Sequence, residues 1–147
     1  MNTRPDGYVS LKAAIFDYLR VNDFVTFAEL MVQFPEIVGN EWMAIQTRNH
    51  VVWNGLTNDA IDAIEALYNE KRCFYWIVPP SVYVAFGITL NMPVFEGQHS
   101  MTAQHWVPVV LHRRAPTEDE MKMLANALVQ DVNGWRDLKA ELKKREH

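Results

Sequence analysis

Apolar side chains recur at helical spacing in three segments of the first half of the chain. In each segment they lie three and four positions apart, which places them on one face of a helix. The second segment begins with Thr26 and Glu29, whose side chains can each accept a hydrogen bond from the other's backbone N–H. Pro35 ends that segment, because a proline disfavours helical geometry in the residue before it. The pattern predicts helices over residues 11–21, 26–34 and 58–71.

Runs of aromatic and β-branched residues lie between and after these helices and predict strands. Residues 50–53 form one such run. Residues 73–86 contain two adjacent prolines at their centre and are typical of a β-hairpin that turns at the prolines. Residues 105–111 form another strand, in which Pro108 favours an edge position because it cannot donate to a neighbouring strand. Residues 41–48 predict a short additional helix.

The last part of the chain, residues 115–147, predicts one long amphipathic helix that starts with a second capping box at Thr117 and Glu120. Asn133 and Gly134 are a place where this helix can kink or break. The apolar stripe of this helix consists of Met121, Leu124, Leu128, Trp135, Leu138 and Leu142. The stripe has two interpretations. It can pack onto the body of the same chain, or it can contact a second copy in a homodimer. In the homodimer the interface residues are Leu128, Trp135, Leu138 and Leu142.

The order of the elements over residues 11–86 resembles a winged helix-turn-helix domain, in which three helices precede a β-hairpin. The connection between the second and third helices is longer than in a compact member of that family. The resemblance implies an α+β fold with a winged-helix-like body of three to four helices and a hairpin over residues 1–114. An extra strand and the C-terminal helix complete it, with residues 115–147 in the same domain or in a dimerisation element. Most such domains bind duplex DNA through the helix before the wing, and others contact proteins.

Composition excludes several other classes of protein. The chain has 147 residues, of which 49% are hydrophobic and 22% charged, so it fits one globular domain with a real core and not a disordered chain. It contains neither an apolar run long enough to cross a membrane nor the apolar segment of a signal peptide. The single cysteine, Cys73, excludes an internal disulfide and fits a reducing compartment. We therefore expect a cytoplasmic protein that does not bind membranes.

Charge changes the expectation for DNA binding. The net charge is −4, and residues 57–71, which include the helix that the resemblance would place in the major groove, contain four acidic residues and one basic residue. A DNA-reading helix needs donors for base edges and is repelled from phosphates by carboxylates. The candidate contacts to nucleic acid are therefore Arg48, Asn58, Lys71, Arg72, Arg113 and Arg114. The basic residues over 139–145 alternate with acidic ones, which is typical of a solvated helix face.

Catalytic and metal-binding chemistry leave no motif in the sequence. The spacing of His99, His105 and His112 matches no rule for metal ligands. Cys73 adjoins aromatic residues, as a small buried side chain does, and the chain has no phosphate-binding loop or nucleophile elbow. We therefore predict a non-enzymatic regulatory module without a cofactor or metal. It binds DNA or, alternatively, serves as a protein–protein interaction adaptor.

Overall fold

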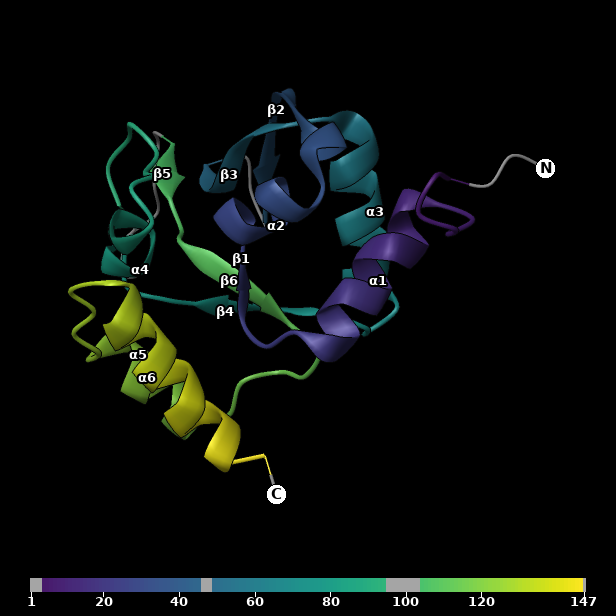
Figure 1. Cartoon of the computed structure of the whole chain (residues 1–147). Coiled ribbons are helices and arrows are strands. Elements are labelled where there is room, and N and C mark those ends of the chain that lie inside the picture. The colour runs from purple at the N-terminus through teal and green to yellow at the C-terminus, as the bar shows by residue number, and fades with distance from the viewer. Residues whose placement is uncertain (1–3, 46–48, 95–103, 147) are drawn as a thin grey trace.

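The computed structural model describes residues 4–45, 49–94 and 104–146 and has a mixed α+β architecture, which confirms the α+β part of the predicted fold (Figure 1). The helices are α1 (Leu11–Val21), α2 (Phe27–Gln33), α3 (Asn58–Asn69), α4 (Ser81–Ala85), α5 (Glu118–Ala125) and α6 (Val132–Lys144), with a 3-10 helix at Pro35–Ile37. The strands are β1 (Val25–Thr26), β2 (Val38–Ala44), β3 (His50–Leu56), β4 (Phe74–Ile77), β5 (His105–Trp106) and β6 (Val109–His112). In Figure 1, α1 and α3 form one flank of the molecule and α5 and α6 form another.

Local capping signals place the first three helices where the sequence predicts them. The helices predicted over 11–21, 26–34 and 58–71 are confirmed as α1, α2 and α3. The Ser10 hydroxyl accepts a hydrogen bond from the Ala13 N–H at 3.1 Å, and the Thr26 hydroxyl accepts one from the Glu29 N–H at 3.0 Å. The Glu29 carboxylate accepts instead from the Tyr18 hydroxyl, at 2.5 Å, so it serves the contact between α1 and α2.

The first sheet has the strand order β1–β6–β4, and both of its pairs are antiparallel. Leu111 on β6 lies opposite Val25 on β1 and Tyr75 on β4. The strand predicted over residues 105–111 is present as two strands, and its predicted edge position is confirmed for β5 but wrong for β6. Pro108 separates β5 from β6, so its missing N–H lies outside both strands, and β6 is a fully buried central strand.

The predicted β-hairpin over residues 73–86 is wrong in its second half, because α4 follows the two prolines and β4 pairs with β6 instead. Pro80 has helical backbone angles, and its carbonyl accepts a hydrogen bond from the Val84 N–H at 3.1 Å. Proline suits the first turn of a helix because its φ is already helical and its missing N–H would have no partner there. The Tyr83 hydroxyl donates to the Val109 carbonyl at 2.6 Å and ties α4 to β6.

The second sheet has the order β2–β3–β5, with β2 antiparallel and β5 parallel to β3. The prediction of a helix over residues 41–48 is therefore wrong for residues 41–44, because these residues belong to β2, which ends at Ala44. Trp42 is 46% exposed and its neighbour Met43 is 1% exposed, because successive side chains of a strand point to opposite faces of the sheet. A side chain at Gly39 would place its Cβ 2.7 Å from the Leu56 carbonyl oxygen, so only glycine allows this close pairing.

Residues 115–147 contain two helices rather than one long helix, and the break lies over residues 126–131, whereas Asn133 and Gly134 lie within α6. The capping box at the start of α5 is confirmed. Asn126 is the C-cap of α5, and the Asp131 carboxylate starts α6 by accepting a hydrogen bond from the Gly134 N–H at 2.8 Å. α5 contacts β4 and α6 contacts α4, so the pair packs against the body of the chain.

One hydrophobic core joins the helices to both sheets. Its largest fully buried side chains include Trp53, Trp76, Trp106, Trp135 and Tyr83. The same core contains Leu142 near the end of α6. Within the described ranges, no helix combines the length and the apolar character needed to cross a bilayer.

Candidate functional site

The connection from α1 to β1 makes a strained turn at Phe24. This buried residue has a φ of +48°, in the left-handed region that non-glycine residues rarely adopt. In this conformation its backbone N–H donates to Nδ1 of His112 at 3.2 Å, and its ring stacks on the imidazole with centroids 3.9 Å apart. Contacts of this kind hold such a conformation in place against its cost. The turn therefore fixes the position of the neighbouring Asp23.

His112 lies at the end of β6 and is completely buried. Because its Nδ1 accepts from Phe24, its Nε2 carries the proton of the neutral ring and donates to the Glu146 carboxylate at 2.6 Å. Burial lowers the pKa of His112 below its usual value of 6.5, despite the opposing effect of Glu146. Burial also acts to raise the pKa of Glu146, but His112 and Arg114 lower it overall.

Arg114 connects the end of the sheet to both C-terminal helices. Its two Nη atoms donate to the two carboxylate oxygens of Glu120, at 2.8 and 2.6 Å, and its Nε donates to Glu146 at 3.0 Å. Its guanidinium lies over the Trp76 ring, 4.9 Å from the centroid. The two hydrogen bonds from Arg114 to Glu120 lower the pKa of Glu120 to about 2. Glu120 is 2% exposed, so its carboxylate is almost fully removed from water, whereas the side chain of Arg114 is 31% exposed.

Asp23 is held by two further cations. Arg113 donates to one of its oxygens at 2.6 Å and Lys143 to the other at 2.6 Å. Burial acts to raise the pKa of Asp23, but the hydrogen bonds from Lys143 and Arg113 lower it overall. We refer to this group as the charged cluster, whose members are Asp23, His112, Arg113, Arg114, Glu120, Lys143 and Glu146. It holds three carboxylates and three cations, so its formal charge balances.

Three members of the charged cluster have the geometry to hold a metal ion. Ligand atoms of Asp23, His112 and Glu146 lie within 4.8 Å of one another. Both nitrogens of His112 are already used, however, and both carboxylates already bind cations. A divalent ion would have to displace these cations and would be repelled by them. The arrangement is better suited to anchoring α6 on the sheet than to metal binding.

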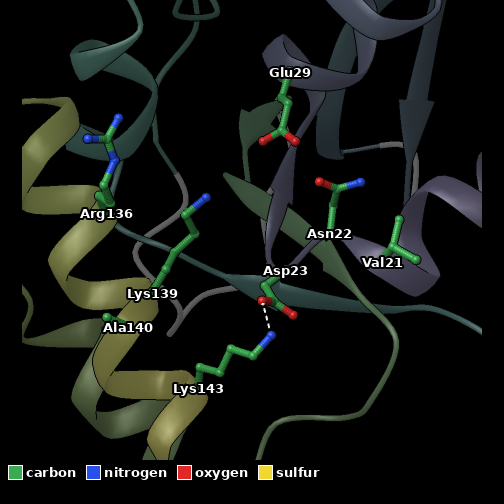
Figure 2. Close-up of a pocket in the computed structure, with 8 residues that line it drawn as sticks. All are labelled: Val21, Asn22, Asp23, Glu29, Arg136, Lys139, Ala140 and Lys143. Atoms are coloured by element: carbon green, nitrogen blue, oxygen red, sulfur yellow. Dashed lines mark hydrogen bonds and ion pairs between the residues drawn. The ribbon is translucent and has the colours of Figure 1, made fainter.

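A cleft opens beside the charged cluster, between α6 and the turn that joins α1 to α2 (Figure 2). We call it the α6 cleft. It has a volume of about 290 Å³ and is lined by Val21, Asn22, Asp23, Glu29, Arg136, Lys139, Ala140 and Lys143. Figure 2 shows the cationic side chains of α6 on one side and Asn22, Asp23 and Glu29 on the other, with Lys143 bridging to Asp23. The cleft is thus a depression with charged and apolar lining, in which three cations face two carboxylates and Lys143 forms an ion pair with Asp23.

No protein-family model, curated protein or solved structure matches this chain. Function is therefore inferred from the geometry of the site itself. Sequence reasoning missed the charged cluster, because Asp23 and His112 are brought together only by the fold. A partial signal existed in α6, where Arg136, Lys139 and Lys143 recur at the spacing of one helix face.

Two of the candidate nucleic-acid contacts lie in the charged cluster. Arg113 and Arg114 are about two-thirds buried and direct their guanidinium groups to Asp23, Glu120 and Glu146. A phosphate would have to compete with these carboxylates, which are already within hydrogen-bond distance. Because of these ion pairs, little of the positive charge of Arg113 and Arg114 remains available to bind a nucleic acid.

The other candidate contacts are scattered around the ends of α3. Asn58 is exposed at the start of α3, and Lys71 is exposed just after its end. Arg72 lies over the Phe16 ring at 4.9 Å and is 3.4 Å from Glu70. Arg48 lies outside the residues that the structure describes, as does His99. Asn58 therefore lies at the opposite end of α3 from Lys71 and Arg72.

The four residues predicted for a homodimer interface have very different environments. Trp135 is 1% exposed and Leu142 is fully buried in the core of this chain, whereas Leu138 is half-buried and Leu128 is 91% exposed. Leu128 lies between α5 and α6. Of the four, it offers the most surface to a second copy.

Replacing Leu128 by Asp is expected to leave the free energy of unfolding within about 0.5 kcal/mol of the wild type, because the side chain is already in water. The matched substitution Leu142→Asp buries a carboxylate in the core and should prevent stable folding. Urea unfolding measures both effects. Light scattering of the Leu128 variant then tests the homodimer prediction, which an unchanged mass would contradict.

Cys73 has the environment of a structural residue. It is completely buried at the start of the segment that leads into β4. Burial raises the pKa of its thiol to about 12, so the reactive thiolate is scarce at neutral pH. A nucleophilic cysteine needs the opposite environment, an accessible site with a lowered thiol pKa.

Proposed function

We propose that this chain is a non-enzymatic, winged-helix-like regulatory module that acts by binding another protein. The order of elements supports the winged-helix part of the proposal. The helices α1, α2 and α3 precede β4, which pairs with β6 in an antiparallel ladder. The two strands of this ladder are farther apart in sequence than the two strands of the hairpin predicted over residues 73–86, because α4 and β5 lie between them.

The charge on the exposed face of α3 favours a protein partner over DNA and is the observation that carries the proposal. In the winged-helix comparison, α3 is the helix that would enter the major groove. Its exposed positions include Asp59, Asp62 and Glu65, whereas Glu70, the C-cap that follows, is paired with Lys12 and Arg72. Carboxylates in this place oppose docking on phosphates. A protein partner can match them with its own cations.

Fluorescence anisotropy with a labelled duplex of about 25 base pairs, in about 50 mM salt, tests the choice between partners. We expect no binding by the wild type at micromolar concentrations. The variant Asp62→Lys/Glu65→Lys should acquire binding that weakens as salt rises, because it places cations on the same face. Arg20→Glu, which changes an exposed residue of α1, is the control and should not acquire it.

Affinity capture of a partner from nuclease-treated extract provides the positive readout. A protein that copurifies in fixed stoichiometry after nuclease treatment would support the proposal. Wild-type binding to duplex DNA with a steep dependence on salt would overturn it in favour of DNA recognition. Loss of the captured protein on nuclease treatment would also count against it, since the complex would then depend on nucleic acid.

A further inference from the structure

The cationic residues of α6 that line the α6 cleft are not all neutralised by residues in the described part of the chain. Arg136, Lys139 and Lys143 lie on the same side of the helix and line the cleft. Lys143 pairs with Asp23 at 2.6 Å. Neither Arg136 nor Lys139 forms an ion pair with any residue in the described ranges, and Lys139 lies 5.7 Å from the centroid of the Trp135 ring. Two cations of the cleft therefore remain available for a ligand.

The carboxylates on the opposite wall of the cleft are already engaged. Asp23 binds both Arg113 and Lys143, so it has no unmatched charge for Lys139. Glu29 accepts a hydrogen bond from the Tyr18 hydroxyl at 2.5 Å. The Tyr18 hydroxyl is neutral and leaves the charge of Glu29 in place, so the cleft lining, with three cations and two carboxylates, keeps a net charge of one positive and attracts an anionic group.

Apolar surface lies next to these cations. Val21 is 64% exposed on one wall, and Ala140 occupies the position on α6 between the charged side chains. The small side chain of Ala140 leaves room close to the helix. A volume of about 290 Å³ lies near the lower limit of about 300 Å³ for ligand sites in proteins. A cleft of this size takes a few side chains of a peptide rather than a duplex.

We propose that the α6 cleft binds an acidic peptide segment of the partner protein, and this inference rests on the proposed function. Carboxylates of the segment pair with Arg136 and Lys139, and a neighbouring apolar side chain covers Val21 and Ala140. A nucleic-acid backbone fits less well, because its repeating phosphates would meet Glu29 on the opposite wall. A peptide can place an amide or a hydroxyl there instead.

Selection of displayed random peptides of about 12 residues on the full chain tests the proposal. We expect the selected peptides to combine Asp or Glu with at least one apolar residue. One selected peptide, made synthetically with a fluorescent label, then serves as the probe in anisotropy titrations. Its affinity should fall as salt rises, because the contacts are between opposite charges near the surface.

Charge reversal in the cleft should abolish most of this binding. The variant Arg136→Glu/Lys139→Glu is expected to weaken the peptide by at least about tenfold. The matched control Lys122→Glu/Lys144→Glu changes the net charge equally at two exposed lysines outside the cleft and should stay within about twofold. A peptide with Lys in place of its acidic residues should regain binding to the reversed variant.

A second variant, Ala140→Gln, fills the cleft without changing charge and should also weaken the peptide. It keeps the test valid if the charge-reversed protein is unstable. The inference is overturned if selection yields no acidic peptides, or if the selected peptides bind both cleft variants, Arg136→Glu/Lys139→Glu and Ala140→Gln, as they bind the wild type. Peptides that bind elsewhere would leave the proposed protein-binding function intact. An oligonucleotide that displaces the peptide and binds more tightly would contradict both proposals.

Discussion

Replacing Arg114 by Ala is expected to lower the free energy of unfolding by about 3–5 kcal/mol near neutral pH, which is typical of a buried carboxylate that loses its cation. Glu120 is 2% exposed and accepts hydrogen bonds from both Nη atoms of Arg114. The substitution also removes the Nε donor to Glu146 and the contact with the Trp76 ring. Urea unfolding followed by tryptophan fluorescence measures the loss.

The size of this loss should depend on pH. Arg114 holds the pKa of Glu120 at about 2, whereas its usual value is 4.5. A carboxylate with a lowered pKa in the folded state stabilises the fold above its unfolded pKa, and this stabilisation disappears as pH falls through the folded pKa. The wild type should therefore lose stability between about pH 4.5 and about pH 2, and the variant should lose less over that range. The difference between the two proteins should be smaller at about pH 3 than near pH 7.

Arg20→Ala is the matched control, because Arg20 also pairs with a carboxylate but lies on the surface, at 2.6 Å from Asp17. We expect little measurable change in its unfolding, since exposed ion pairs contribute little to stability. A loss for Arg114→Ala as small as that of the control would contradict the structural role of the charged cluster. So would a loss that does not change with pH.

The helices were predictable from sequence wherever their signals are local. A capping hydroxyl and an apolar stripe within a few residues define α1, α2 and α3, and these signals act whatever the rest of the chain does. The same holds for the start of α5, where Thr117 and Glu120 form both hydrogen bonds of the capping box. The side chain of Glu29 shows the limit of such reasoning, because its carboxylate accepts a hydrogen bond from the Tyr18 hydroxyl of α1 and not from the backbone N–H of Thr26.

The wrong predictions concern segments whose structure depends on distant partners. Val82 and Val84 favour a strand by composition, yet this segment is helical because Pro80 starts a turn and the Tyr83 hydroxyl reaches Val109 on β6. β2 is extended because it pairs with β3. Neither contact can be derived from the local pattern.

The candidate site was beyond sequence reasoning for the same reason. Asp23 follows the first helix, His112 ends the last strand and Glu146 lies close to the C-terminus. No spacing rule connects residues so far apart in sequence. The basic residues of α6 were visible, but their alternation with acids is typical of a solvated face. Only the fold places one side of that helix against Asn22 and Glu29.

Replacing Trp135 by Ala is expected to lower the free energy of unfolding by about 3–5 kcal/mol, the usual cost of deleting a large aromatic side chain from a core. Trp135 is 1% exposed and belongs to the hydrophobic core shared by both sheets. Its loss should weaken the packing of α6, which also carries the cationic wall of the α6 cleft. Urea unfolding measures the stability, and hydrogen exchange of the α6 amides shows whether this helix opens first.

Two matched variants separate packing from other contributions of Trp135. Trp42→Ala deletes the same side chain where it is 46% exposed, so its effect should be clearly smaller. Trp135→Phe keeps most of the volume and removes an indole N–H that has no hydrogen-bond partner, so it should cost much less than Trp135→Ala. If Trp135 served mainly a contact between two copies, Trp135→Ala would lower the mass in light scattering and leave unfolding at low protein concentration unchanged. That result would contradict the assignment of α6 to the core of its own chain.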